Sequence, residues 1–374
     1  MEKIKKLRKL FKTFDLDGYI VPKNNNFFGE YVLTPEDNLK YISNFTGSAG
    51  FAVILKNKNY MFVDGRYTIQ AGIQCGDQFK ICTIPKKYPY NIFKQKNLKL
   101  GFDPKLHTEN SLNGLFKNPF IKLRPINKNL IDLLWKREKN LNIKPFYFIK
   151  DKDAGLKVEQ KLAKLVKLIK LNKANYLFTT ASENVAWLLN IRGKDTSYSP
   201  LPNSHAVVDE NGEVLLFCNL KKINKSFKNK INKSVKIYDF NLLPKFFLNL
   251  SSKKILIDVL TCSIFYKSVI EKNNLIIKTQ DPIYYLKSIK NKTEINNSIK
   301  SHIYDGAALT KFIFWLKDNF RKMKISEISA QEKLLRFRKK NKTFHNLSFP
   351  TISGSGPNSA IIHYKADKKS NRVL

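Results

Sequence analysis

The chain has 374 residues, and 43% of them are hydrophobic, which is enough to bury a core in each of two or three domains and excludes a disordered protein. Its 68 basic and 30 acidic residues give a net charge of +38, but only nine of the basic residues are arginine and the lysines are spread along the whole chain. Because surfaces that read nucleic acid cluster arginine among aromatic residues, we predict no specific nucleic-acid partner and only weak polyanion binding at low salt.

Residues 1–21 are basic, with lysine mixed into each turn of an amphipathic pattern. They lack the uninterrupted apolar segment of a signal peptide or a membrane span, so we predict a cytoplasmic protein with no membrane partner. The cysteines show no metal-type spacing and are interpreted as reduced core residues. They are Cys75, Cys82, Cys218 and Cys262.

The first part of the chain predicts a helix, then a strand, then a pair of strands joined by a short polar turn. The expected elements are an amphipathic helix around residues 7–14 and strands at 19–21, 51–55 and 60–63.

The same order of elements recurs further along the chain. The second set comprises a helix around residues 162–169 and strands at 176–178, 205–208 and 214–217. This internal repeat predicts two related α/β domains in tandem. The helical pattern breaks between Asn140 and Asp153 and again near Ile289, so we expect domains at residues 1–145 and 146–289.

A third segment, residues 290–374, begins with a long helix. Asn291 and Glu294 have the spacing of a capping box, and a second helix is expected at 328–338. Two strands, 347–353 and 360–364, are expected to flank a Gly-Ser-Gly-Pro loop. One helix pair and one hairpin cannot bury the apolar face of the long helix, so this third domain is predicted to be incomplete. That face carries Ile295, Ile299, Ile303, Leu309, Ile313 and Leu316.

Five motifs occur in an order that resembles the cytosolic-type aminopeptidase P family. They are NFTGSAG (44–50), VDGRYTIQA (63–71), ENVAWLLNIRG (183–193), KNKTEINNSIKSHIYDG (290–306) and SFPTISGSGPNSAIIHY (348–364), with GEYV (29–32) near the start. The resemblance implies an α/β fold class: two tandem creatinase-type N-terminal domains followed by an incomplete pita-bread α+β catalytic domain.

The resemblance further implies hydrolysis of the bond between an N-terminal residue and a following proline. Such chemistry uses two divalent metal ions, typically Mn²⁺, that share a hydroxide and polarise the carbonyl. The family holds these ions with two aspartates, one histidine and two glutamates, none of which has a counterpart here. We therefore expect no metal ligands and no cofactor in this chain alone, and predict a truncated, split or decayed enzyme that is inactive by itself.

Two residues match substrate-binding positions of the family. His363, in AIIHY, resembles a histidine that donates a hydrogen bond to the reacting carbonyl or a metal-bound oxygen, which would make it a catalytic and substrate-binding residue. Arg66, in VDGRY, resembles an arginine that holds a peptide carbonyl or carboxylate with its planar fork. The alternatives are a strand histidine satisfied by a neighbour, and a buried ion pair of Arg66 with Asp64 or a turn-stabilising role.

Other polar groups are interpreted structurally. His302 and Asp305 have the i, i+3 spacing of metal ligands but are expected on an exposed helix face. An aspartate pair is expected in a solvated linker turn, two glycines are expected to let the backbone turn tightly instead of cradling phosphate, and two serines lack the partners of a nucleophile. These are Asp151 and Asp153, Gly354 and Gly356, and Ser353 and Ser355.

The expected partners follow from the resemblance: peptides with proline at the second position, a second copy in a homodimer, and a separately encoded C-terminal half that completes the metal site. A protein of another class stays open: a non-catalytic module for dimerisation or peptide binding, which would bind partners without metal. A polyanion-binding protein that uses its positive charge is the third possibility.

Overall fold

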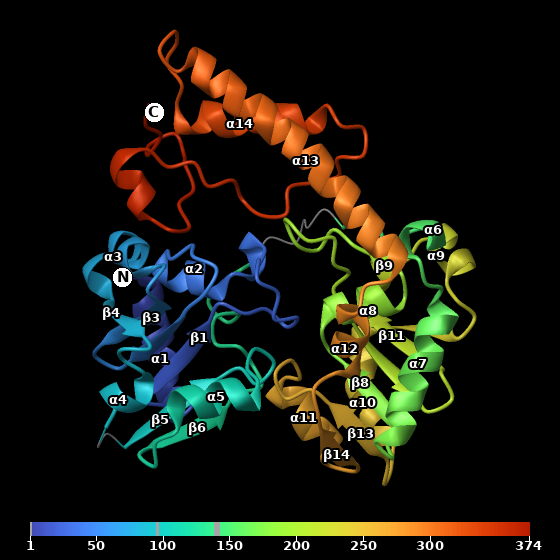
Figure 1. Cartoon of the computed structure of the whole chain (residues 1–374). Coiled ribbons are helices and arrows are strands. Elements are labelled where there is room, and N and C mark those ends of the chain that lie inside the picture. The colour runs from blue at the N-terminus through green and yellow to red at the C-terminus, as the bar shows by residue number, and fades with distance from the viewer. Residues whose placement is uncertain (1, 95–96, 138–142) are drawn as a thin grey trace.

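The computed structural model describes residues 2–94, 97–137 and 143–374. Two units, each built around a twisted sheet, lie side by side, and a pair of helices with a long irregular C-terminal segment lies above them (Figure 1). The N-terminal unit is blue to cyan in that view, the second unit green to yellow, and the third segment orange to red.

The first unit contains a six-stranded sheet of order β4-β3-β2-β1-β5-β6. Tyr19 pairs with Ile54 across the antiparallel β1 and β2, and Phe51 pairs with Phe62 across β2 and β3. Its helices are α1 (Glu2–Thr13), α2 (Asn38–Ser43), α3 (Thr68–Cys75), α4 (Pro89–Ile92) and α5 (Glu109–Phe116). Its strands are β1 (Gly18–Pro22), β2 (Phe51–Leu55), β3 (Asn59–Asp64), β4 (Lys80–Ile84), β5 (Leu98–Phe102) and β6 (Ile121–Pro125).

The second unit repeats this topology, with the order β12-β11-β10-β8-β13-β14 and a small β7-β9 ladder outside the sheet. Its helices are α6 (Asp151–Ala154), α7 (Val158–Leu171), α8 (Ser182–Leu188), α9 (Lys225–Lys230), α10 (Leu243–Asn249), α11 (Ile264–Ile270) and α12 (Pro282–Ser288). Its strands are β7 (Tyr147–Phe148), β8 (Tyr176–Thr179), β9 (Ile191–Arg192), β10 (Ser204–Asp209), β11 (Val214–Cys218), β12 (Val235–Asp239), β13 (Lys254–Ile257) and β14 (Leu275–Lys278).

The repeat predicted from the sequence is therefore present in three dimensions. In each sheet the first strand of the repeat, β1 or β8, pairs antiparallel with one neighbour and parallel with the other. These central strands are apolar along nearly their whole length because helices cover both faces of the sheet. Each sheet accordingly has two hydrophobic cores, one on either face. The four cysteines are free and buried in these units, as expected.

The region expected to join the first two domains is only partly described. Residues 140–142 of the predicted boundary lie outside the described residues, and Tyr147–Phe148 forms β7. Asp151 and Asp153, expected in a solvated turn, are exposed as predicted but lie in the one-turn helix α6.

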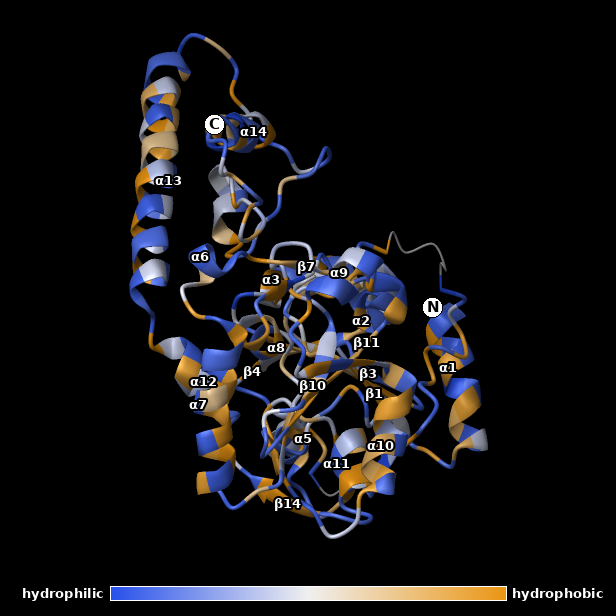
Figure 2. Ribbon diagram, turned by 90° about the vertical axis from the view of Figure 1, so that its right-hand side faces the viewer, coloured by the Kyte–Doolittle hydropathy of each residue, from blue (hydrophilic) through white to orange (hydrophobic). Residues whose placement is uncertain are grey.

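The third segment contains α13 (Lys292–Asn319) and α14 (Glu327–Lys339). The predicted capping box is present: Asn291 Oδ1 accepts a hydrogen bond from the Glu294 N–H at 3.0 Å, and Glu294 Oε2 accepts one from the Asn291 N–H at 2.9 Å. Figure 2 shows α13 extending away from the sheets with hydrophobic residues along its length. Ile299 and Ile303 are 54% and 63% exposed, so the apolar face of this helix lacks a partner within the described chain, as expected.

The prediction of strands at residues 347–353 and 360–364 was wrong. The first of these segments is irregular, and the second is a turn that follows a short 3₁₀ helix, Gly356–Ala360. A strand requires a neighbouring strand to complete its backbone hydrogen bonds, and no such neighbour is present beside these residues in the part of the chain that the structure describes.

A buried lysine in the second unit predicts a measurable pH dependence of stability. Lys161 on α7 is 2% exposed, and its Nζ donates to Trp187 O at 2.7 Å and Asn190 Oδ1 at 2.6 Å. Burial lowers the pKa of Lys161 from 10.5 to about 8. Between these two values the unfolded chain binds more protons than the folded chain, so the free energy of unfolding rises with pH.

We expect Lys161→Met to remove a rise of about 2 kcal/mol between about pH 7.5 and pH 9.5. The measurement is urea unfolding at both pH values. The control is Lys164→Met, an exposed lysine on the same helix, which should keep the wild-type slope. Equal slopes for the two variants would contradict a depressed pKa at Lys161.

Candidate functional site

The two residues predicted to bind substrate lie in contact with each other. Arg66 Nη1 is 3.1 Å from His363 Nε2, although 297 positions separate them in the chain. Arg66 lies in the turn that follows β3, closed by a hydrogen bond from the Tyr67 N–H to Asp64 O at 3.1 Å. His363 lies in a second turn, where the Tyr364 N–H donates to Ile361 O at 3.1 Å. The fold thus brings two predicted site residues together from opposite ends of the chain.

Asp64 holds the guanidinium of Arg66 in a bidentate ion pair. Arg66 Nε donates to Asp64 Oδ1 at 2.9 Å and Nη2 donates to Oδ2 at 2.8 Å. The hydrogen bonds from Arg66 lower the pKa of the Asp64 carboxyl. The ion pair considered as the alternative role for Arg66 is therefore present, but the Arg66 side chain is 47% exposed, so the pair is not buried. The ion pair with Asp64 leaves the Nη1 atom of Arg66 directed at His363.

The ring of His363 stacks on the ring of Tyr67, with centroids 5.2 Å apart and planes at 14°. Tyr67 is buried, and its hydroxyl lies 2.8 Å from Ser48 Oγ. A guanidinium has donors only, so His363 Nε2 accepts the hydrogen bond from Arg66 and the ring proton lies on Nδ1. In this arrangement the Nε2 atom of His363 is an acceptor, whereas the Nδ1 atom carries the hydrogen that can be donated to another group.

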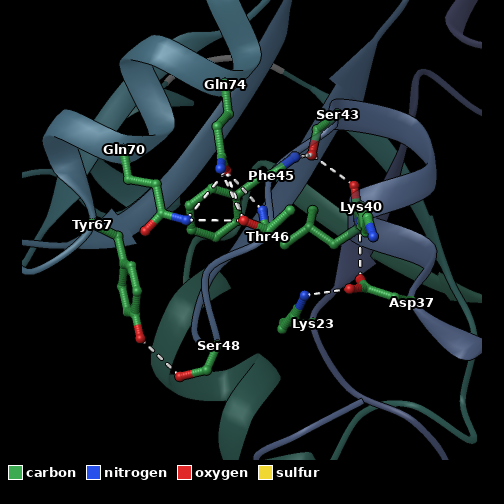
Figure 3. A network of polar contacts seen from close by, with 11 residues as sticks. Lys23, Asp37, Lys40, Ser43, Phe45, Thr46, Ser48, Tyr67, Gln70 and Gln74 are labelled. Atoms are coloured by element: carbon green, nitrogen blue, oxygen red, sulfur yellow. Dashed lines mark hydrogen bonds and ion pairs between the residues drawn. The ribbon is translucent and has the colours of Figure 1, made fainter. Parts of the chain in front are cut away.

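The NFTGSAG motif forms the loop that supports Tyr67 (Figure 3). Thr46 is held by two glutamines of α3: its N–H donates to Gln74 Oε1 at 2.8 Å, and its Oγ1 accepts from Gln70 Nε2 at 3.0 Å. Gly47 is required because a Cβ there would lie 2.2 Å from Phe45 Cζ. Two of the recognised motifs therefore build one structure, in which the loop presents Ser48 to the tyrosine beneath His363.

A buried ion pair anchors the other side of this loop (Figure 3). Lys23, just after β1, pairs with Asp37, and their side chains are 8% and 6% exposed. Asp37 also caps α2, because its Oδ1 accepts a hydrogen bond from the Lys40 N–H at 2.9 Å. The pair joins the end of β1 to the helix that leads into the NFTGSAG loop.

The remaining polar candidates have structural partners. His302 is exposed and its Nδ1 lies 2.8 Å from Ser298 O, while Asp305 forms an ion pair with Arg338 at 2.6 Å. Ser355 Oγ donates to Val373 O at 2.9 Å. Gly356 has a φ of +54°, which suits a tight turn, but the segment leads into the 3₁₀ helix and not into the expected strand.

The described residues do not fit a dinuclear metal site. Within residues 2–94, 97–137 and 143–374, no group of three or more histidine, cysteine, aspartate or glutamate side chains is arranged to hold a metal ion. Asp64 and Asp305 are each paired with an arginine. Among the described residues, no helix is both long enough and apolar enough to cross a membrane.

Comparison with known protein families identifies the class of protein to which this chain belongs. Residues 3–130 and residues 137–294 each match the creatinase/prolidase N-terminal domain, and residues 297–374 match metallopeptidase family M24. The protein is thus an M24-type chain with two creatinase-type domains and a partial catalytic domain, which confirms the predicted fold class.

The family follows from similarity over the whole chain. A probable Xaa-Pro aminopeptidase P of Coprinopsis cinerea is 34% identical over 98% of this chain, and Xaa-Pro aminopeptidase 1 of Dictyostelium discoideum is 31% identical over all of it. The crystal structure of X-prolyl aminopeptidase from Caenorhabditis elegans, described as a cytosolic enzyme with a di-nuclear active site, superposes with a TM-score of 0.91 at 27% identity over 100% of this chain. The chain belongs to the aminopeptidase P family.

The chain matches only part of the length of each of these relatives. The chain spans 63% of the length of both curated relatives and 65% of the nematode enzyme.

Tyr67 and Ser48 take part in this arrangement but were not predicted from the sequence. Tyr67 adjoins Arg66 in VDGRY and Ser48 lies within NFTGSAG, so their motifs offered a signal.

Proposed function

We propose that this chain supplies the peptide-binding part of an Xaa-Pro aminopeptidase, which hydrolyses the bond between an N-terminal residue and a following proline. The observation that carries the proposal is the 3.1 Å contact between Arg66 and His363 above Tyr67. Family membership and the names of the relatives support the substrate class.

Arg66 and His363 would bind the peptide backbone. The guanidinium is a permanent cation with planar donors, so it suits a peptide carbonyl or a C-terminal carboxylate. His363 would contribute its ring hydrogen to the carbonyl next to proline, where negative charge develops during hydrolysis. Asp64 takes the Nε hydrogen and one Nη2 hydrogen of Arg66, and one Nη1 hydrogen is directed at His363, so the second hydrogens of Nη1 and Nη2 would be the donors left for substrate.

The hydrolytic step itself would need divalent metal ions, for which Mn²⁺ is our proposal. The described residues do not supply a site for them. We therefore propose that these residues by themselves do not hydrolyse peptides, and that activity requires the two aspartates, one histidine and two glutamates with which the family holds its metal ions. A cytoplasmic location and a homodimer complete the proposal.

The test is hydrolysis of an Xaa-Pro-Xaa tripeptide in the presence of Mn²⁺. The purified chain is assayed alone and mixed with a polypeptide that carries the missing metal ligands. Hydrolysis in the mixture only is the expected result. Hydrolysis by the chain alone would overturn the inactivity, and no hydrolysis in either sample would overturn the proposed reaction.

A peptide-binding module without catalysis is the second candidate. The arrangement of Arg66 and His363 favours it, because these two side chains can hold a peptide backbone without any metal ion. The two candidate functions are separated by calorimetric titration of the same tripeptide into a solution of the chain that contains a metal chelator. Binding without metal, together with an inactive mixture, would select the module.

A further inference from the structure

The C-terminal segment that carries His363 is organised around one buried carboxylate. Glu327, the first residue of α14, is 0% exposed. Its Oε1 accepts hydrogen bonds from the Ser355 N–H at 2.7 Å and Asn358 Nδ2 at 2.9 Å. Its Oε2 accepts from the Tyr364 hydroxyl at 2.8 Å and the Arg372 N–H at 3.1 Å. Four points spread over eighteen residues of irregular chain therefore converge on a single side chain.

All four donors are neutral groups. Burial raises the pKa of Glu327, but the hydrogen bonds from Asn358, Tyr364 and the backbone outweigh it and leave the pKa below its ordinary value. A carboxylate that accepts several hydrogen bonds is stabilised in its ionised form. The carboxylate thus accepts hydrogen bonds that a neutral side chain of the same shape could not accept in full.

The backbone around Glu327 adds to this attachment. The Glu327 N–H donates to Arg372 O at 2.9 Å, and the Leu374 N–H donates to Ile325 O at 2.9 Å. The last residues of the chain are thereby tied to the start of α14. Because residues 347–364 form no strand, side-chain contacts take the place of a sheet in fixing this segment.

We infer that Glu327 is the positioning residue that holds His363 against Tyr67 and Arg66. The connection runs through Tyr364: its hydroxyl is bound to Glu327, and its backbone N–H closes the turn in which His363 lies. With Tyr364 buried on one side of the turn, the neighbouring His363 ring is directed to the other side, onto Tyr67. The consequence for hydrolysis rests on the proposed function, but the positioning itself does not.

The first test needs no activity. Glu327→Gln keeps the shape but replaces one oxygen with an NH₂ group that faces the Tyr364, Asn358 or backbone donors. In the chain labelled at histidine and tyrosine, we expect the nuclear Overhauser contact between the His363 and Tyr67 rings to be lost. We also expect amide hydrogen exchange across residues 355–372 to accelerate at least about 10-fold. Glu332→Gln, an exposed glutamate on the same helix, should change neither signal.

A milder variant keeps the inference testable if Glu327→Gln does not fold. Tyr364→Phe removes one donor and leaves the carboxylate with three, so the ring contact should weaken while the protein stays folded. Survival of the His363 and Tyr67 contact in both variants would overturn the inference.

The second test uses the reconstituted peptidase mixture. If Glu327 acts through His363, the double variant Glu327→Gln/His363→Ala should hydrolyse the tripeptide no more slowly than His363→Ala alone. Additive losses would overturn the connection between the two residues. If the mixture is inactive with the wild-type chain, the proposed function has failed and the ring contact alone decides the inference.

Discussion

Arg66→Ala is expected to lower hydrolysis of an Xaa-Pro-Xaa peptide about 100- to 1,000-fold in the mixture of this chain with the polypeptide that carries the metal ligands. Under the proposed function, the guanidinium supplies a hydrogen-bond donor to the substrate beside His363. Arg66→Lys should recover little of the loss, because an ammonium cannot form the bidentate pair with Asp64 that orients the donor. His363→Ala should cause a loss of similar size.

The control for this prediction is Arg124→Ala. Arg124 is an exposed arginine on β6 that is also paired with an aspartate, with a side chain 50% exposed against 47% for Arg66. Its removal should leave hydrolysis within about twofold of the wild type, because exposed ion pairs contribute little to stability. The measurements are kcat and KM for each variant. Equal activity of the Arg66→Ala and Arg124→Ala variants would show that Arg66 has no role in binding substrate.

Arg66 and His363 should also act as a unit. Because their side chains touch, the losses caused by Arg66→Ala and His363→Ala are expected to be non-additive in the double variant. A double variant whose loss equals the product of the two single losses would show that the two residues act independently on substrate.

Gly155→Ala is expected to lower the free energy of unfolding of the second unit by about 2–4 kcal/mol. Gly155 ends α6 with a φ of +75°, where any other residue is strained by about 1–2 kcal/mol. A Cβ at this position would also lie 2.3 Å from Asn291 Oδ1. Asn291 cannot move away freely, because its side chain caps α13 and its Nδ2 donates to Ala154 O at 2.9 Å. Losing the cap adds about 0.5–2 kcal/mol.

The measurement is the urea unfolding midpoint, with Gly72→Ala as the matched control. Gly72 lies inside α3 without a positive φ, and a Cβ added there would meet no described atom within 4 Å. Alanine there should stabilise the helix by about 0.5–1 kcal/mol. If Gly155→Ala raised the free energy of unfolding as Gly72→Ala is expected to do, the contact between Gly155 and Asn291 would not limit the placement of α13.

The largest part of the fold could be predicted because its signals are local. The strands around Tyr19 and Phe178 are continuous apolar runs bounded by polar turns, and such runs form buried strands wherever helices cover them. The capping box at Asn291 needs only residues three apart in the chain. The domain boundaries near residues 145 and 289 depend on less marked changes in pattern and stay predictions.

The failure at residues 347–364 has a physical reason. The apolar pattern there was read as two strands, but a strand is stable only beside another strand, and its sequence cannot supply that neighbour. The same lack of partners within the described residues leaves Ile299 and Ile303 exposed on α13. Here the sequence correctly indicated that apolar surface would lack cover, but not that the hairpin would be replaced by turns held by Glu327.

By itself the sequence determined the tandem repeat, the caps, the buried cysteines and the motifs that carry Arg66 and His363, because each depends on residues close together in the chain. Only the tertiary structure decided that Arg66 lies against His363, that Tyr67 stacks beneath them, and that Glu327 holds the segment in place. These contacts join residues as far as 297 positions apart. The distance between such residues is set by the packing of the whole chain, which no local pattern encodes.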